Sequence, residues 1–385
     1  MPRPAPRFAI PAGAALDRPS MSCPAGGDFL DLATRVGQLF VVGFEGTAPT
    51  GELDRFVRDL RPGGLVLFSR NVADGAQLRA LNGALARATS PPPLLAVDQE
   101  GGRVDRLRAI LPPMPPAAAL ASWSEERIRL YAAALGGVLS AAGFNTDFAP
   151  VLDLSRADAE NGIGDRSFGE DAALVARCGG AFAAGLGDAG IAPFLKHFPG
   201  LGATEVDSHI EMPVCTREGA ALWERDLLPF RACARQAAGI MIGHARYPAF
   251  DPDRAVPASA SEAIVTGLLR RRMDFVGIAL TDDLGMGAVA GPSAGDIALR
   301  CLRAGNDMVM FCNRPDDARA AYETVLAAAV DGRIPEDLVD RAVGRILSAK
   351  ARFGITGLGG PRAGETSQRP ELRAAILKLQ PFAGA

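Results

Sequence analysis

Ionisable side chains follow short apolar runs at five places along this chain. They are Asp98 with Glu100, Asp153, Lys196 with His197, His244, and Asp282 with Asp283. A charge beside an apolar core costs several kcal/mol unless it is paired or used. A single carboxylate at such a place can simply cap a helix or bind a loop amide. Repetition at five run ends favours one shared polar site.

The types of these side chains favour glycosyl transfer. A carboxylate can attack an anomeric carbon while a second group moves the proton. Asp282 and Asp283 are consecutive, so on a strand they point to opposite faces, and the spacing does not decide which one enters a site. The three histidines, His197, His209 and His244, show no H-x-H or H-E-x-x-H spacing. We therefore expect no metal and no other cofactor.

A polar loop follows the run that ends at His197. It reads Pro199-Gly200-Leu201-Gly202-Ala203-Thr204-Glu205-Val206-Asp207-Ser208-His209. Its glycines permit movement, and Asp207 lies two residues before His209. A carboxylate at that place can hold the tautomer of the ring and raise its basicity, so that the imidazolium protonates a leaving oxygen. An ordinary surface hydrogen bond between the two is the alternative.

Buried strands alternating with helices must position these residues. We expect strands at 38–44, 64–69, 94–98, 146–154, 191–197, 239–244, 277–282 and 308–313. Helical periodicity marks 77–88, 124–141, 171–186, 216–236, 261–272, 295–304, 316–331 and 335–353. Runs that are apolar on both faces are typical of parallel strands. This alternation predicts an α/β fold, a single (β/α)8 TIM-type barrel whose site lies at the C-terminal mouth. A doubly wound sheet is the alternative, although no G-x-G-x-x-G follows the first strand.

Composition narrows the class of protein. The 385 residues suit one barrel with short extensions, and 48% hydrophobic against 22% charged residues is typical of a globular chain. With 41 basic and 44 acidic residues, a net charge of −3 and no Lys/Arg-rich run, we expect neither nucleic acid nor membrane as a partner. The six cysteines lack C-x-x-C spacing, which favours buried thiols in a reducing compartment.

The ends of the chain differ from its middle. Residues 1–27 are rich in Pro, Ala and Gly without a secretory apolar segment, and we expect a disordered extension there. The barrel is predicted over 28–354, followed by a tail at 355–385 that docks as a short helix near Pro370–Leu379. Without a long apolar run, the chain is expected to be cytoplasmic. We expect a monomer or a weak dimer.

Five motifs together resemble glycoside hydrolase family 3. They are Val97-Asp98-Gln99-Glu100-Gly101-Gly102-Arg103-Val104, Asn161-Gly162-Ile163-Gly164-Asp165-Arg166-Ser167-Phe168, Lys196-His197-Phe198-Pro199-Gly200, Asp207-Ser208-His209 and Thr281-Asp282-Asp283-Leu284. The branch they resemble is the single-domain bacterial β-N-acetylglucosaminidases of cell-wall recycling. This resemblance implies an exo-acting, retaining enzyme that removes terminal β-linked GlcNAc from muropeptide fragments.

The resemblance also implies a role for each matching residue. Asp282 would attack the anomeric carbon to form a glycosyl-enzyme, and His209, supported by Asp207, would serve as acid and then as base. The residues that match sugar-holding positions are Asp98, Arg106, Arg166, Lys196 and His197. Glu100 is expected only to support the Gly101-Gly102 turn.

Two positions depart from the family pattern. Leu201 stands where the family loop often has a second histidine, which removes a polar group beside the loop. Asp105 stands before Arg106 in place of an apolar residue or Gln. We expect Asp105 to pair with Arg103 or Arg106 and so to perturb the sugar contact.

Other functions stay open. Within the same fold, the chain fits a β-glucosidase, or a phosphorylase, because a neutral imidazole repels an incoming phosphate less than a carboxylate does. Outside that class, Lys196 at a strand end suits a Schiff-base aldolase. A barrel that binds sugar without catalysis is the last alternative.

Overall fold

Eight parallel strands close into a barrel in the computed structural model, which describes residues 30–156, 161–204, 212–253, 256–289 and 291–356. Their order around the barrel is β1-β10-β9-β8-β7-β6-β3-β2, and β2 pairs with β1 again. The strands are β1 (Phe40–Gly43), β2 (Gly64–Leu67), β3 (Leu94–Val97), β6 (Thr146–Asp147), β7 (Ala192–Phe198), β8 (Gly239–Ile242), β9 (Ile278–Asp283) and β10 (Met308–Phe311). The predicted (β/α)8 barrel is confirmed, with a strand in every predicted run.

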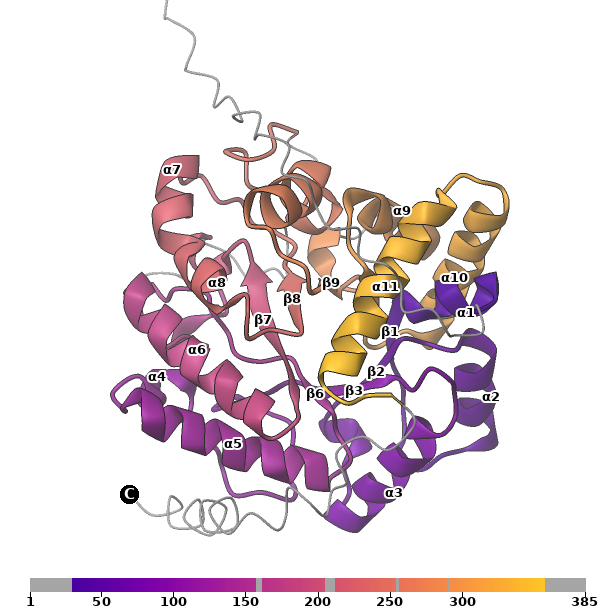
Figure 1. Cartoon of the computed structure of the whole chain (residues 1–385), viewed down its shortest axis with the longest axis horizontal. Coiled ribbons are helices and arrows are strands. Elements are labelled where there is room, and N and C mark those ends of the chain that lie inside the picture. Colours follow the sequence, from indigo (N-terminus) through magenta and orange to yellow (C-terminus); the bar gives the residue numbers. More distant parts are fainter. Residues whose placement is uncertain (1–29, 157–160, 205–211, 254–255, 290, 357–385) are drawn as a thin grey trace, which may run out of the picture. The chain divides into compact units, whose positions relative to one another are not determined.

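Helices form the outer layer around these strands (Figure 1). The longer ones are α2 (Gly51–Leu60), α3 (Gly75–Ala86), α5 (Glu125–Ala141), α6 (Ala172–Asp188), α9 (Ala294–Ala304), α10 (Pro315–Val330) and α11 (Glu336–Arg352). A π-helical segment, Ala263–Arg272, takes the place between β8 and β9. The short α1 (Leu32–Gln38) precedes β1 and packs against α10 and α11. The sequence analysis did not predict α1 or α2.

Side-chain caps fix where several helices begin. The side chain of Asp74 accepts hydrogen bonds from the amides of Ala76 and Gln77 at the start of α3. The N-caps of α1, α2, α5, α6 and α9 work in the same way, through Asp31, Thr50, Ser124, Asp171 and Ser293. Each such cap stabilises a helix by about 1 kcal/mol. They set the lengths of the βα loops that reach the mouth.

The strands form a dry, rigid base for those loops. All residues of β1, β2, β3 and β8 are buried, as their sequence of Val, Leu, Ile and Phe dictates. Phe148 and Phe194 pack edge to face with ring centroids 5.3 Å apart. Burial of each such side chain contributes about 1.5–3 kcal/mol. The tightly packed strands therefore keep the side chains at their ends in fixed positions.

Two predicted elements differ from the structure because of prolines. The strand predicted at 146–154 ends at Asp147, since Pro150 has no amide for the ladder, and Val151 makes only a bridge to Lys196. The helix predicted at 216–236 is divided into α7 (Gly219–Ala221), a π-helical turn and α8 (Leu228–Cys233). Pro229 lies in the first turn of α8, where its missing amide costs least.

The remaining sequence predictions concern cysteines, membranes and chain ends. The described cysteines, Cys178, Cys215, Cys233, Cys301 and Cys312, are buried and unpaired, as expected, and burial raises the pKa of Cys233 to about 12. No helix in the described part of the chain is long and apolar enough to cross a bilayer. The predicted extension 1–27, and the tail from residue 357 onward, lie outside the described residues.

Candidate active site

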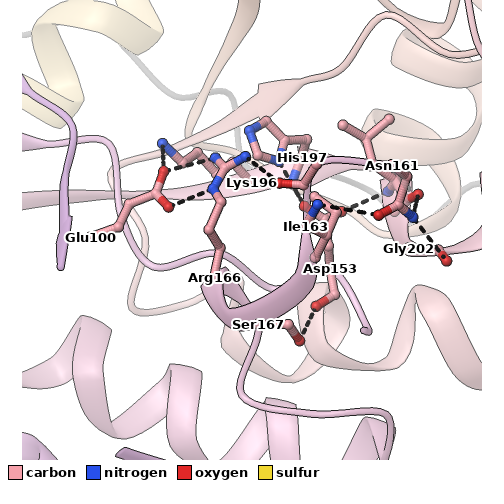
Figure 2. A network of polar contacts seen from close by, with 12 residues as sticks. Glu100, Asp153, Asn161, Ile163, Arg166, Ser167, Lys196, His197 and Gly202 are labelled. Atoms are coloured by element: carbon pink, nitrogen blue, oxygen red, sulfur yellow. Dashed lines mark hydrogen bonds and ion pairs between the residues drawn. The ribbon is translucent and has the colours of Figure 1, made fainter. Parts of the chain in front are cut away.

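A buried ion network lies at the C-terminal ends of β3 and β7. Lys196, at the end of β7, places Nζ 2.6 Å from Asp98 Oδ1 and 2.6 Å from Glu100 Oε1. Arg166 donates two hydrogen bonds of 2.8 Å, from Nε and Nη2, to the carboxylate of Glu100 (Figure 2). Asp98 lies just beyond β3, and Glu100 lies in the short strand β4 (Gln99–Gly101) that follows it. The sequence analysis predicted Asp98, Arg166 and Lys196 as site residues, and the structure brings them together.

Opposite charges in this network keep its members ionised. Burial alone would raise the pKa of Glu100, but Lys196 and Arg166 outweigh it and hold that pKa well below its usual range. Burial works against the charge of Lys196 too, yet Asp98 and Glu100 raise its pKa above the ordinary value. A protonated amine is no nucleophile, which argues against the Schiff-base alternative at Lys196.

Glu100 is a central member of this network, and the prediction that it only supports the Gly101-Gly102 turn is wrong. Its side chain is 4% exposed and joins Lys196 to Arg166. Asp98 is the more open carboxylate, with 15% of its side chain exposed. Glu100 thus fixes the two cations, while Asp98 retains access to a ligand.

The imidazole of His197 is held by Asp153, from the loop after β6. Asp153 Oδ2 lies 2.6 Å from His197 Nδ1 and accepts the amide hydrogen of His197 at 3.1 Å. Its other oxygen accepts from the amide of Leu201 at 2.6 Å. A carboxylate against Nδ1 places the proton there and leaves Nε2 for another partner. Asp153 therefore binds loop amides, as the capping alternative held, and orients a predicted site residue as well.

Hydrogen bonds hold the first residues of the loop that leads to Asp207 and His209. Asn161 Nδ2 donates to the carbonyls of Leu201 and Thr204 at 3.2 and 3.0 Å, and its Oδ1 accepts from Ile163 (Figure 2). A Cβ on Gly202 would lie 1.8 Å from the carbonyl oxygen of Leu154, so only glycine fits there. Asp207 and His209 themselves lie outside the described residues.

Asp282 and Asp283 are the last two residues of β9, and their carboxylates have different partners. Asp283 Oδ1 accepts from the amides of Gly285 and Cys312 at 3.0 Å each, which ties β9 to β10. Burial raises the pKa of Asp283. Burial also acts to raise the pKa of Asp282, but His197, the amide of Asp283 and Lys196 outweigh it and lower the pKa. Asp282 is thus the carboxylate that faces the histidines and stays ionised.

Arg106 lies beside the mouth and outside the ion network. Its guanidinium carbon is 5.4 Å from the centre of the Phe68 ring, and its Nε is buried without a partner among the described residues. The expected pairing of Asp105 with Arg103 or Arg106 is wrong. Asp105 accepts from Gln99 Nε2 at 2.9 Å, because both lie on the small hairpin of β4 (Gln99–Gly101) and β5 (Val104–Asp105).

Sequence reasoning missed one more carboxyl group. Asp147, at the end of β6, is fully buried and accepts from the amide of Gln99 at 3.0 Å. Burial raises its pKa well above the ordinary value. It lies near Lys196, Asp98 and Glu100, under the ion network. It lies within the strand predicted at 146–154, where no spacing marked it as a site residue.

The described side chains of the site do not form a metal centre. Within the described ranges, no group of three or more His, Cys, Asp or Glu residues has the geometry to hold a metal ion. The carboxylates of the site are instead matched by Lys196, Arg166 and His197. The arrangement provides an anionic side chain, Asp282, beside a rigid polar wall that can bind hydroxyl groups.

A barrel whose mouth carries these polar residues is typical of a glycoside hydrolase, and comparison with known proteins identifies the family. The family model described as glycosyl hydrolase family 3 N terminal domain matches residues 31–349. The chain belongs to glycosyl hydrolase family 3. Within that family it is an enzyme of the β-hexosaminidase branch, as its relatives show.

Those relatives are curated proteins and solved structures. The β-hexosaminidase of Alkalilimnicola ehrlichii is 39% identical over 287 residues, which span 72% of this chain and 81% of that protein. A family 3 β-N-acetylglucosaminidase from Paenibacillus sp. FPU-7 superposes with a TM-score of 0.82 at 34% identity, over 91% of this chain and 68% of that one. The Neisseria gonorrhoeae enzyme NagZ, solved with N-trifluoroacetyl-D-glucosamine, gives a TM-score of 0.75 at 31% identity, over 90% and 98%.

Proposed function

We propose that this protein is a retaining exo-β-N-acetylglucosaminidase that acts through a covalent glycosyl intermediate on Asp282. The observation that carries the proposal is the contrast at the end of β9. Asp283 is engaged by two backbone amides, whereas the pKa of Asp282 is lowered by His197 and the amide of Asp283 against the effect of burial. A nucleophilic carboxylate must be ionised at the pH of the reaction.

His209, supported by Asp207, is the proposed acid and base. Both belong to the loop whose first residues are fixed by Asn161 and Asp153 at the mouth. The imidazolium donates a proton to the glycosidic oxygen as Asp282 attacks. The neutral imidazole then takes a proton from the water that hydrolyses the intermediate, so the anomeric configuration is retained.

The ion network is the proposed binding site for the terminal sugar. Asp98, Arg166, Lys196 and His197 present polar donors and acceptors whose positions are fixed by their own pairing. Such groups bind vicinal hydroxyls in one orientation only, which holds the anomeric carbon near Asp282. Arg106, with a free Nε beside Phe68, is the proposed outer contact.

The N-acetyl sugar is inferred from the relatives, and its aglycone from the sequence resemblance to the enzymes of cell-wall recycling. The curated relatives are β-hexosaminidases, and the Neisseria enzyme was solved with an N-acylated glucosamine. We infer GlcNAc-terminated muropeptides as the substrate class and the cytoplasm as the compartment. Purified muropeptides incubated with the protein should release free GlcNAc, and their persistence would contradict this assignment.

A chromogenic assay tests the proposal against the β-glucosidase and phosphorylase alternatives. We expect an aryl β-GlcNAc to be cleaved much faster than its β-glucoside counterpart. In phosphate buffer the product should be free GlcNAc, and sugar 1-phosphate would indicate a phosphorylase instead. The Asp282→Ala variant should be inactive on both substrates, and a variant that retains turnover would exclude Asp282 as nucleophile.

The acid role of His209 has its own signature. Only poor leaving groups need protonation, so His209→Ala should lose activity on them far more than on activated aryl glycosides. Equal losses on the two kinds of substrate would contradict the role. The Asp207→Asn variant should show the same pattern in weaker form.

A further inference from the structure

His244 lies at the end of β8, next to the strand that carries Asp282, and the proposed mechanism gives it no role. The side chain is fully buried. Nδ1 lies 2.8 Å from Ser259 Oγ, and Nε2 lies 3.1 Å from the main-chain carbonyl oxygen of Asp283. Both ring nitrogens therefore have a defined partner.

These partners fix the tautomer of the ring. A carbonyl oxygen can only accept, so Nε2 must carry a hydrogen and donate it to Asp283. Burial lowers the pKa of His244, although Asp282 and Asp283 act in the opposite sense, and the ring is neutral. Nδ1 then accepts from the hydroxyl of Ser259. Ser259 is itself held in place, because Asn306 Nδ2 donates to its carbonyl oxygen at 2.7 Å.

We propose that His244 is a positioning residue for the nucleophile, which it holds through the main chain of Asp283. This inference rests on the proposed role of Asp282. The carbonyl of Asp283 is held by His244, and the amide of the same residue donates to Asp282 Oδ1 at 2.8 Å. The ring of His244 is thus connected to the carboxylate of Asp282 by two hydrogen bonds through the main chain of Asp283.

The Asp282-Asp283 dipeptide is also held on its other side, by the end of β10. Asp283 Oδ1 accepts from the amide of Cys312, just beyond β10, at 3.0 Å. The end of β9 is therefore fixed to β8 by the side chain of His244, and to the end of β10 by the side chain of Asp283 and the amide of Cys312. Displacement of a reacting group by about 1 Å can cost on the order of 100-fold in rate. His244 supplies the β8 side of this fixation without adding a charge beside Asp282.

Two replacements of His244 separate its two hydrogen bonds. In His244→Gln the amide nitrogen takes the place of Nε2 and can still donate to the carbonyl of Asp283. In His244→Asn the shorter amide replaces Nδ1 and keeps only the contact with Ser259. The probe is a fluorinated GlcNAc derivative with a good leaving group, which traps the intermediate. Its labelling rate, the dissociation constant for GlcNAc and the melting temperature are measured for each protein.

The expected result is a loss of nucleophile attack without a loss of sugar binding. We expect His244→Asn to be labelled at least about tenfold more slowly than the wild type, with the GlcNAc dissociation constant changed less than about twofold. His244→Gln should recover most of the rate. Should His244→Asn be labelled at the wild-type rate, or His244→Gln be as slow as His244→Asn, the inference is overturned.

Failure of the proposed function has a different appearance. A wild-type enzyme labelled on a side chain other than Asp282 contradicts the nucleophile assignment itself. If His244→Asn does not fold, Ser259→Ala gives the second test, because it removes the partner that fixes the ring. We expect it to slow labelling severalfold at unchanged GlcNAc affinity, and an unchanged labelling rate counts against the inference.

Discussion

Asp153 and His197 are joined by two contacts to one oxygen: Asp153 Oδ2 lies 2.6 Å from the ring nitrogen Nδ1 and 3.1 Å from the main-chain amide of His197. Backbone and ring are thus held by the same carboxylate. Since Asp153 is fully buried, this carboxylate cannot exchange its partners for water. The ring of His197 is fixed in both position and tautomer.

The Asp153→Asn variant should lose about 100-fold in kcat/KM. An amide can donate or accept at Nδ1, so the ring loses its fixed tautomer while the shape of the side chain is kept. Asp147→Asn is the matched control, because Asp147 is as deeply buried, and burial raises its pKa and so favours the neutral carboxyl, which an amide resembles. We expect the control to keep activity within a few-fold, as measured on an aryl β-GlcNAc. Equal losses in both variants would show that His197 has no special need of a carboxylate.

Glu100→Gln should reduce both stability and sugar affinity. The change leaves Lys196 and Arg166 short of a buried counter-charge, and removal of one partner of such a pair costs about 3–5 kcal/mol. Glu45→Gln is the control, because Glu45 pairs with Arg70 at 2.9 Å but is 68% exposed, and surface pairs contribute about 0–1 kcal/mol. Urea unfolding and GlcNAc titration measure the two effects. Similar stability losses for both variants would contradict the importance given to this network.

The buried lysine of α11 gives a pH-dependent contribution to stability. Burial lowers the pKa of Lys350 to about 7, and its Nζ donates to Gln38 Oε1 at 2.7 Å. The unfolded chain, with an ordinary lysine pKa of about 10.4, binds more protons between these values, so the contribution of Lys350 to stability rises with pH in that window. The Lys350→Met variant lacks this rise.

The comparison of the two proteins isolates that effect. The free energy of unfolding of Lys350→Met minus that of the wild type should be largest near pH 7. It should fall by up to several kcal/mol as the pH rises towards about 10. Other titrating groups cancel in this difference, and urea unfolding at pH 7, 8 and 9 measures it. A difference that does not change with pH would show that Lys350 is charged in the folded protein.

The strand positions could be predicted because buried parallel strands leave a local signal. Runs such as Leu94–Val97 and Met308–Phe311 are apolar on both faces, and this pattern needs no knowledge of distant residues. Helix α2 was missed although Thr50 caps it and its buried residues, Leu53, Phe56, Val57 and Leu60, have the i, i+3, i+4, i+7 spacing of an amphipathic helix. Where proline interrupts a run, as at Pro150 and Pro229, propensity overstated the length of an element.

Members of the ion network could be found from the sequence, but their partners could not. A position after a strand identifies Asp98 and Lys196 as members of the mouth, since all strands end there. The pairing of Arg166 with Glu100 joins residues 66 positions apart, and that of Lys196 with Asp98 joins residues 98 apart. Spacing carries no sign of such contacts. Glu100 was therefore assigned to a turn, and Asp105 to the wrong partners.

Mass spectrometry of the trapped wild-type enzyme tests the central claim most directly. After reaction with a fluorinated GlcNAc derivative, the proteolytic peptide that contains Asp282 should gain the mass of one sugar, and fragmentation should place it on that residue. An adduct on Asp283, on His209 or on any other side chain would contradict the assignment of Asp282 as the nucleophile.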